Sequence, residues 1–241
     1  MSRLWVIVPA AGRGTRFGGE CPKQYLPLAG ETVLAQTLRR LDGAGALAIL
    51  VGTADGNLAM ASSLSLKTPL RGFSGGAERA LTVLNGLRAL ATEAHADDLV
   101  AVHDAARPCL RLADCLSVVA AAAACPAGAL LARPVADTVK RADEAGCVAA
   151  TTDRRGLWLA QTPQVFAYDR LKTALEEGVA AQAALTDEAS AVERLGDCPR
   201  LVMGHADNIK ITLPEDLRMA ELYLAAQAEE ETLRHADRTR F

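Results

Sequence analysis

Short apolar runs alternate with segments of helical periodicity along most of this chain, and this alternation constrains the fold more than any other feature. Neighbouring parallel strands need a crossover connection, usually a helix, and they are apolar on both faces. One of the intervening segments carries leucines at positions 81, 84, 87 and 90, which is helical spacing. We therefore expect an α/β fold with a mostly parallel sheet and helices on both faces. The predicted strands are 4–8, 46–52, 98–104, 128–135 and 200–204, and the predicted helices are 32–41, 77–91, 112–124, 168–175 and 214 to about 230.

Residues 136–160 break this alternation. Polar and apolar residues alternate there around the sequence Asp-Glu-Ala-Gly, which is typical of an antiparallel hairpin. Such a hairpin would carry exposed Val139, Val148, Leu157 and Trp158, and an isolated hairpin is unstable in water. We expect a protruding β-arm that packs on another surface, with a second subunit as the candidate.

Composition limits the classes of protein to which the chain can belong. Its 241 residues, half of them hydrophobic, can bury one large core, so we predict a single domain over residues 1–241 with the arm at about 136–160. The net charge of −3 and the lack of a basic block argue against binding to nucleic acid or to a membrane surface. No apolar run reaches the length of a membrane span and no cationic segment precedes the first run, so the protein is predicted to be cytoplasmic. Six cysteines without a C-x-x-C pair are expected to be free thiols.

The loop after the first predicted strand has the composition of a polyphosphate site. Glycines remove side chains where backbone N–H groups could close on phosphate oxygens, and cations supply compensating charge. A Walker loop would end in Gly-Lys-Ser or Gly-Lys-Thr, and a dinucleotide-binding loop would have glycine in place of Phe17, so neither pattern fits. We expect a site for a nucleoside triphosphate. The residues concerned are Gly12, Arg13, Gly14, Arg16, Gly18, Gly19 and Lys23.

Ligands of parallel sheets bind beyond the carboxyl ends of the strands. This rule predicts that four loops share one site. They are residues 9–23, the pair Gly75-Gly76, residues 104–108 and residues 207–210.

Eight segments, taken in order, resemble one family closely. They are PAAGRGTRF, PKQYLPL, GGAER, VHDAARP, the arm from ADTVKR to DRRGLW, QTPQ, TDEASAVE and ADNIKIT, and together they extend from about residue 4 to residue 224. The family is 2-C-methyl-D-erythritol 4-phosphate cytidylyltransferase, of the non-mevalonate isoprenoid pathway. The resemblance implies a Rossmann-like, nucleotide-diphospho-sugar transferase-like fold and a homodimer in which the β-arm crosses to the partner.

The resemblance also implies the reaction and its catalytic residues. The phosphate of 2-C-methyl-D-erythritol 4-phosphate joins the α-phosphorus of CTP, and pyrophosphate leaves. Because this nucleophile is already an anion, no general base is needed, and cations together with Mg²⁺ brought by CTP must offset the crowding of negative charge. Arg16 and Lys23 match the residues that stabilise the transition state. Lys210 and Arg154 match residues that position the acceptor, Arg154 from the neighbour's arm together with Thr138.

Further matches concern the acceptor, the metal and the nucleotide. Arg107, Thr162 and Asp104 match contacts on the acceptor side. Asp104 is also a candidate metal ligand, while for Asp207 two roles are open, either helping to hold Mg²⁺ or orienting Lys210. The residues predicted to contact CTP are Pro9, Ala10, Ala11, Gly12, Gly14, Gly75, Gly76, Thr82 and Asp104.

The sequence departs from the family pattern beside the glycine pair. Ala77 stands where an aspartate is expected and Thr82 where a serine is expected, so the Thr82 hydroxyl is retained but the carboxylate is lost. The resemblance therefore implies the transferase class more specifically than it implies the selection of CTP. Two alternatives stay open: a cytidylyltransferase for another polyol phosphate, such as ribitol 5-phosphate, and a catalytically silent nucleotide-binding scaffold.

Overall fold

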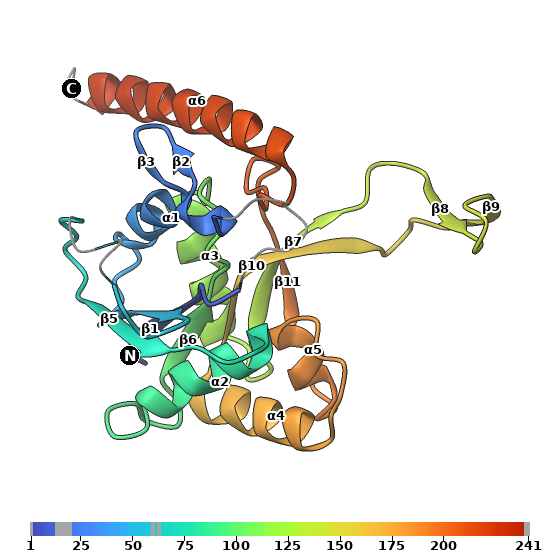
Figure 1. The fold of residues 1–241 in the computed structure, drawn as a ribbon, viewed down its shortest axis with the longest axis horizontal. Helices are drawn as coiled ribbons and strands as arrows, with labels where there is room; N and C mark the ends of the chain where they lie inside the picture. The colour runs from blue at the N-terminus through green and yellow to red at the C-terminus, as the bar shows by residue number, and fades with distance from the viewer. Residues whose placement is uncertain (1, 13–20, 59–60, 62–63, 239–241) are drawn as a thin grey trace.

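A seven-stranded sheet lies between two layers of helices in the computed structural model, which describes residues 2–12, 21–58, 61 and 64–238 (Figure 1). The strand order is β11-β7-β10-β6-β1-β4-β5. All neighbours pair in parallel except β10, which is antiparallel to both β6 and β7. The expected α/β fold with a mostly parallel sheet is confirmed. The strands are β1 (Leu4–Pro9), β4 (Ile49–Thr53), β5 (Leu70–Ser74), β6 (Leu99–Val102), β7 (Ala129–Pro134), β10 (Trp158–Ala167) and β11 (Arg200–Met203).

Strand β1 shows why the apolar runs do not alternate with polar residues. Val6 and Val8 face one core together with residues of α1 (Val33–Leu41) and α3 (Leu112–Ala123). Trp5 and Ile7 face a second core with residues of α2 (Arg79–Ala89) and α4 (Tyr168–Ala180). Because helices cover both faces, successive side chains of a central strand are buried in opposite directions.

Several elements differ from the sequence-based expectation, and three of them show the physical reason. Strand β5 has an exposed Arg71 and Gly72, so an apolar run does not mark this edge of the sheet. Strand β10 was not predicted as a strand of the sheet, and its first residues, 158–160, were assigned to the arm. It follows the arm directly and pairs Trp158 with Pro134 in antiparallel orientation. No crossover helix precedes it, so the alternation of helix and strand does not indicate it in the sequence. Helix α5 (Glu188–Glu193) has only six residues, too few for helical periodicity to be visible.

The predicted arm is present as an antiparallel pair, β8 (Val139–Ala142) and β9 (Val148–Thr152), which extends from the ends of β7 and β10 (Figure 1). Its turn is closed by Asp143, whose side chain accepts hydrogen bonds from the backbone N–H groups of Ala145 and Cys147. Gly146 adopts φ of +79°, which an L-residue rarely adopts. Val148 is 64% exposed, so the arm has apolar surface that its own chain does not cover.

The chain ends in the long helix α6 (Pro214–Arg238), which lies over the short pair β2 (Pro27–Leu28) and β3 (Glu31–Thr32) (Figure 1). The Asp216 side chain accepts hydrogen bonds from the backbone N–H groups of Thr212 and Leu213 and so fixes the start of the helix. Ala220 and Leu224 of α6 pack in a third apolar cluster with Ile211. None of the helices in the described part of the chain is long and apolar enough to cross a membrane.

Candidate active site

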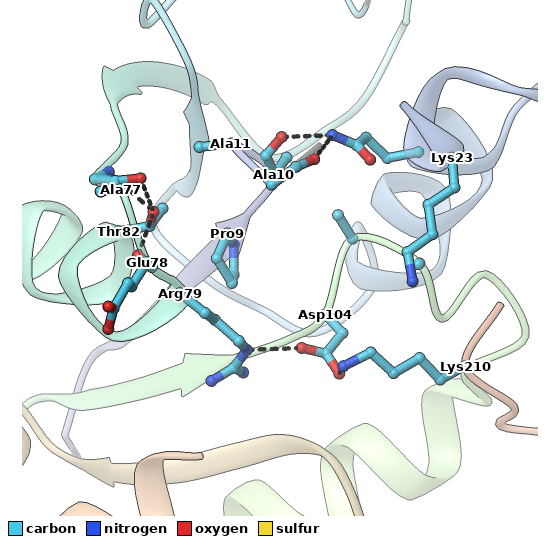
Figure 2. A pocket seen from close by; sticks show the side chains of 15 residues that line it. Pro9, Ala10, Ala11, Lys23, Ala77, Glu78, Arg79, Thr82, Asp104 and Lys210 are labelled. Atoms are coloured by element: carbon cyan, nitrogen blue, oxygen red, sulfur yellow. Dashed lines mark hydrogen bonds and ion pairs between the residues drawn. The ribbon is translucent and has the colours of Figure 1, made fainter. Parts of the chain in front are cut away.

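Two adjoining cavities lie beyond the carboxyl ends of β1 and β6. The main cavity is lined by residues 9–12, Lys23, Gln24, residues 76–79, Thr82, residues 104–106 and Lys210 (Figure 2). The side cavity is lined by Arg79, Asp104, Arg107, residues 160–162, Gln164, Thr186, Asp187 and Lys210. Arg79, Asp104 and Lys210 line both. All four loops predicted to share a site therefore contribute to this region.

Gln24 fixes the beginning of the glycine-rich loop. Its side-chain amide donates hydrogen bonds to the carbonyl oxygens of Ala10, at 2.8 Å, and Gly12, at 2.9 Å. The Ala11 N–H belongs to the same planar peptide unit as the Ala10 carbonyl and points the opposite way, so its direction is fixed as well. The predicted residues Gly14 and Arg16 lie outside the described residues.

Lys23 opens a short 3₁₀ turn, Lys23–Tyr25, at the wall of the main cavity. Its ammonium group donates a 2.6 Å hydrogen bond to the carbonyl oxygen of Ile211. The Ile211 N–H in turn donates to the carbonyl oxygen of Ala106. The two lysines predicted to be catalytic, Lys23 and Lys210, therefore meet in one region although they come from opposite ends of the chain (Figure 2).

Asp104 is surrounded by three cations. Its Oδ1 accepts from Arg79 at 3.0 Å, and its Oδ2 lies 2.9 Å from the Lys210 ammonium and 3.4 Å from Arg107 Nε. Burial acts to raise the pKa of Asp104, but the positive charges of Arg79, Lys210 and Arg107 outweigh it and hold that pKa well below its ordinary value. Asp104 is therefore an ionised group that orients cations and not a proton donor.

Arg79 also binds a second buried carboxylate. Its two terminal nitrogens contact Glu188, at 2.6 Å and 3.0 Å, and Glu188 has no exposed surface. Burial acts to lower the pKa of Arg79, but Glu188 and Asp104 raise it above its ordinary value. The cluster of Arg79, Arg107, Lys210, Asp104 and Glu188 thus holds three positive and two negative charges, a net charge of +1. Such a cluster suits an anionic ligand.

The glycine pair is required by close packing. A Cβ on Gly75 would lie 2.4 Å from the Cβ of Ala11, and a Cβ on Gly76 would lie 2.5 Å from the Cβ of Leu81. The Thr82 hydroxyl accepts a hydrogen bond from the Gly76 N–H and donates to the Glu78 carbonyl (Figure 2). Thr82 therefore holds the shape of this loop, and the contact with CTP predicted for it stays a prediction.

The comparisons with known proteins agree with one another. The sequence profile of the IspD family, 2-C-methyl-D-erythritol 4-phosphate cytidylyltransferase, matches residues 4–226. The chain belongs to the IspD family. The 2-C-methyl-D-erythritol 4-phosphate cytidylyltransferase of Aeromonas hydrophila is 52% identical over 230 residues, which cover 93% of this chain and 90% of the relative. That of Chromohalobacter salexigens is 50% identical over 226 residues, which cover 93% and 91%.

Solved structures of the IspD family have the same fold. The crystal structure of the 2-C-methyl-D-erythritol 4-phosphate cytidylyltransferase of Francisella tularensis matches with a TM-score of 0.79 and 34% identity, and covers 92% of this chain and 100% of the relative. That of Thermus thermophilus matches with a TM-score of 0.75 and 32% identity, and covers 92% and 98%. The family resemblance predicted from the sequence is confirmed.

Two residues that the resemblance assigned to the acceptor lie away from the cavities of their own chain. Thr138 and Arg154 are exposed on the β-arm and line neither cavity. The Arg154 guanidinium donates to the carbonyl oxygen of Ala136 at the base of the arm. By contrast, Arg107 and Thr162 line the side cavity, and the Thr162 hydroxyl oxygen accepts a hydrogen bond from the Asp104 N–H.

The two carboxylates predicted as metal ligands are each bonded to cationic side chains in this structure. Asp104 forms ion pairs with Arg79, Lys210 and Arg107, and Asp207 lines neither cavity. Asp207 Oδ2 accepts from Arg111, at 2.7 Å, and from Gln227, at 2.8 Å. Among the described residues, no group of three or more His, Cys, Asp or Glu side chains could hold a metal ion. The bonds to Arg111 and Gln227 hold the segment that carries Lys210, and the two roles considered for Asp207, holding Mg²⁺ or orienting Lys210, stay predictions.

Three residues of this site were present in the sequence motifs without an assigned role: Gln24, Arg79 and Glu188. Arg79 and Glu188 are 109 positions apart, and only the fold brings them together. The sequence around Glu188 contains the pattern of a helix start, because Asp187 and Ser190 form a capping box. This capping box places Glu188 in the first turn of α5. Neither residue type nor spacing indicates that its partner is Arg79.

Proposed function

We propose that the main cavity holds CTP and that the side cavity holds 2-C-methyl-D-erythritol 4-phosphate, the two substrates of the IspD reaction. The reaction forms 4-diphosphocytidyl-2-C-methyl-D-erythritol and pyrophosphate in the non-mevalonate isoprenoid pathway. The observation that carries this assignment is the net-positive cluster of Arg79, Asp104 and Lys210 at the junction of the two cavities. We place the reaction in the cytoplasm as part of the same proposal.

The chemistry follows from the charges at this junction. An oxygen of the acceptor phosphate forms a bond to the α-phosphorus, and the bond from that phosphorus to the bridging oxygen breaks, so that pyrophosphate leaves with the electron pair. No proton has to be removed from the nucleophile, and the main barrier is the approach of two anions. Lys210 and Arg107 offset the charge of the acceptor phosphate. Lys23, which contacts the Ile211 carbonyl in this structure, offsets charge on the α-phosphate and the leaving group.

Mg²⁺ enters this proposal as part of the substrate MgCTP. The triphosphate oxygens are hard anionic ligands that suit this cation, and Asp104 and Asp207 are already paired with lysine and arginine. The protein's own contribution to the phosphates is then its fixed cations, with Arg16 predicted to join them from the glycine-rich loop.

We also propose that the arm completes the acceptor half of a partner's site. Thr138 and Arg154 line neither cavity of their own chain, the arm exposes Val148, and Leu159 at the adjoining start of β10 is 58% exposed. In a two-fold dimer each arm would cover apolar surface and carry Arg154 to the other subunit.

The test compares acceptors. Pyrophosphate release is measured with CTP and Mg²⁺ in the presence of 2-C-methyl-D-erythritol 4-phosphate, of ribitol 5-phosphate, or of no acceptor. We expect release with methylerythritol phosphate at a kcat/KM about a hundredfold above that with ribitol phosphate, because ribitol phosphate has a longer chain and lacks the methyl branch. Faster release with ribitol phosphate would change the assigned acceptor. Binding of CTP without release for either acceptor would support the silent scaffold.

A further inference from the structure

His103 follows strand β6 directly and has no exposed surface. Both of its ring nitrogens have partners. Nδ1 lies 3.0 Å from the Thr162 hydroxyl oxygen, and Nε2 lies 3.1 Å from the carbonyl oxygen of Arg107. Thr162 and Arg107 both line the side cavity, while His103 itself lines neither cavity. The ring therefore stands behind the side cavity and contacts two residues of its wall.

For a neutral ring, the direction of every hydrogen bond in this group can be deduced. The Asp104 N–H can only donate, so the Thr162 oxygen accepts that bond. The Arg107 carbonyl can only accept, so Nε2 carries a proton. In a neutral ring Nδ1 is then unprotonated, and it accepts the hydroxyl proton of Thr162. Neutral histidine with the proton on Nε2 satisfies all three bonds, whereas an imidazolium ion would donate from Nδ1 and turn the Thr162 proton away from the ring.

Burial supports this neutral state, because it lowers the pKa of His103 to about 4. The carboxylate of Asp104 acts in the opposite direction and the guanidinium of Arg107 in the same direction as burial. At neutral pH the ring is therefore uncharged and can serve both partners at once.

We propose that His103 is a positioning residue for the acceptor half of the site, fixing Thr162 and the 104–107 loop to each other. This inference rests on the proposed function, because it assumes that the side cavity holds the polyol phosphate. The chain of hydrogen bonds continues beyond the ring. The Arg107 side chain donates a 2.7 Å hydrogen bond to the carbonyl oxygen of Asn208, which is two residues before Lys210. His103 thereby links β10, the loop after β6 and the lysine-bearing segment.

This arrangement also restricts Thr162. Because its hydroxyl proton is directed to His103, Thr162 can meet a substrate hydroxyl only as an acceptor. The resemblance assigned Thr162 to the acceptor without a direction, and the bonds around His103 supply one.

Two substitutions separate the two bonds. In His103→Asn the amide is placed near the Nδ1 position, so its oxygen can still accept from Thr162 while the bond to the Arg107 carbonyl is lost. In His103→Gln the amide reaches the Nε2 position, so its nitrogen can still donate to Arg107 while the bond to Thr162 is lost. We expect each variant to raise the KM for methylerythritol phosphate about tenfold, the cost of one buried hydrogen bond, and to leave the KM for CTP within about twofold.

The control is Val102→Ala, a cavity-forming change in the neighbouring residue of β6, which is buried but makes no side-chain hydrogen bond. It should lower the unfolding temperature without changing either KM. Equal increases of both KM values in the His103 variants, or no increase at all, would overturn the proposal. A parent protein that forms no cytidylyl product would instead refute the proposed function.

A second readout does not depend on turnover. In ¹⁵N NMR of the parent protein at pH 7, the ring signals of His103 can be identified by their loss in His103→Gln, since the chain has only four histidines. We expect a protonated Nε2 and an unprotonated Nδ1. A proton on Nδ1, in either the other tautomer or the imidazolium ion, would overturn the proposal.

Discussion

At the scale of single residues, the site is organised by charges that are neutralised only in part. Asp104 contacts Arg79, Lys210 and Arg107, and Glu188 shares Arg79, so one positive charge is left over. Removing one member of such a buried cluster is costly, because the remaining charges lose a partner without gaining water. Asp104 and Glu188 therefore hold Arg79, Arg107 and Lys210 in place beside the cavities in the absence of substrate.

His103 gives the stability of the fold a predictable dependence on pH. Its folded-state pKa of about 4 lies below the ordinary value of 6.5, so the unfolded chain binds a proton in a range where the folded chain does not. The stabilisation is therefore complete above about pH 6.5 and is lost as the pH falls toward 4, by about 3 kcal/mol in total. Urea unfolding of the parent protein and of His103→Gln at several pH values measures this term by difference. The difference in unfolding free energy should shrink between pH 8 and pH 4.5, and a difference that stays constant over this range would contradict the assignment.

At the scale of elements, the sequence predicted the strands and helices that have a clear apolar period, among them β1, β6, α1 and α3. It did not predict β5 or β10, for physical reasons. Strand β5 is at the edge of the sheet and partly polar, while β10 is antiparallel and follows the arm without a helix. The helix predicted at 168–175 continues to Ala180, and the last helix continues to Arg238.

The site was predicted to the extent that it depends on loops at strand ends. The four loops were expected together because parallel strands present their carboxyl ends at one edge. Pairings such as Arg79 with Glu188 depend on how α2 and α5 pack, and no local pattern contains that information. The direct contacts predicted for Gly14 and Arg16 stay predictions, because these residues lie outside the described part of the chain.

The loop between β5 and α2 offers a test of an element's shape. Gly76→Ala would place a methyl group 2.5 Å from the Cβ of Leu81, a contact that only a backbone shift can relieve. We expect a loss of stability of about 1–3 kcal/mol and a raised KM for CTP. Thermal unfolding and steady-state kinetics measure the two effects. Gly12→Ala is the control for stability, because its added Cβ would meet no atom within 4 Å. An unchanged unfolding temperature in Gly76→Ala would show that this close packing is not needed.

At the scale of the whole molecule, the arm decides whether a site is complete within one chain. Mixing Arg154→Ala with Lys23→Ala should restore activity if Arg154 acts across a dimer, because each mixed dimer then has one intact site. With random exchange, half of the dimers are mixed, so recovery should approach about a quarter of the parent activity. Pyrophosphate release before and after verified subunit exchange measures this recovery.

The matched control for this experiment mixes Lys23→Ala with Lys210→Ala. Both lysines line the main cavity of their own chain, so every site in a mixed dimer lacks one of them and no activity should return. Recovery in both mixtures would mean that exchange alone restores activity. Recovery in neither mixture would mean that Arg154 serves its own chain or that the arm does not cross.

The central claim is that this pair of cavities carries out cytidylyl transfer. Its most direct test follows the reaction of CTP with 2-C-methyl-D-erythritol 4-phosphate by ³¹P NMR. Two enzyme variants are compared with the parent, Lys23→Ala and the control Lys67→Ala. Lys67 is an exposed lysine that lines neither cavity, so this control removes the same charge elsewhere. We predict that Lys67→Ala forms the diphosphocytidyl product at the parent rate, while turnover by Lys23→Ala falls by about 10² to 10⁴, the scale for losing a charge aimed at the transition state. Turnover by Lys23→Ala within about threefold of the parent would contradict the account.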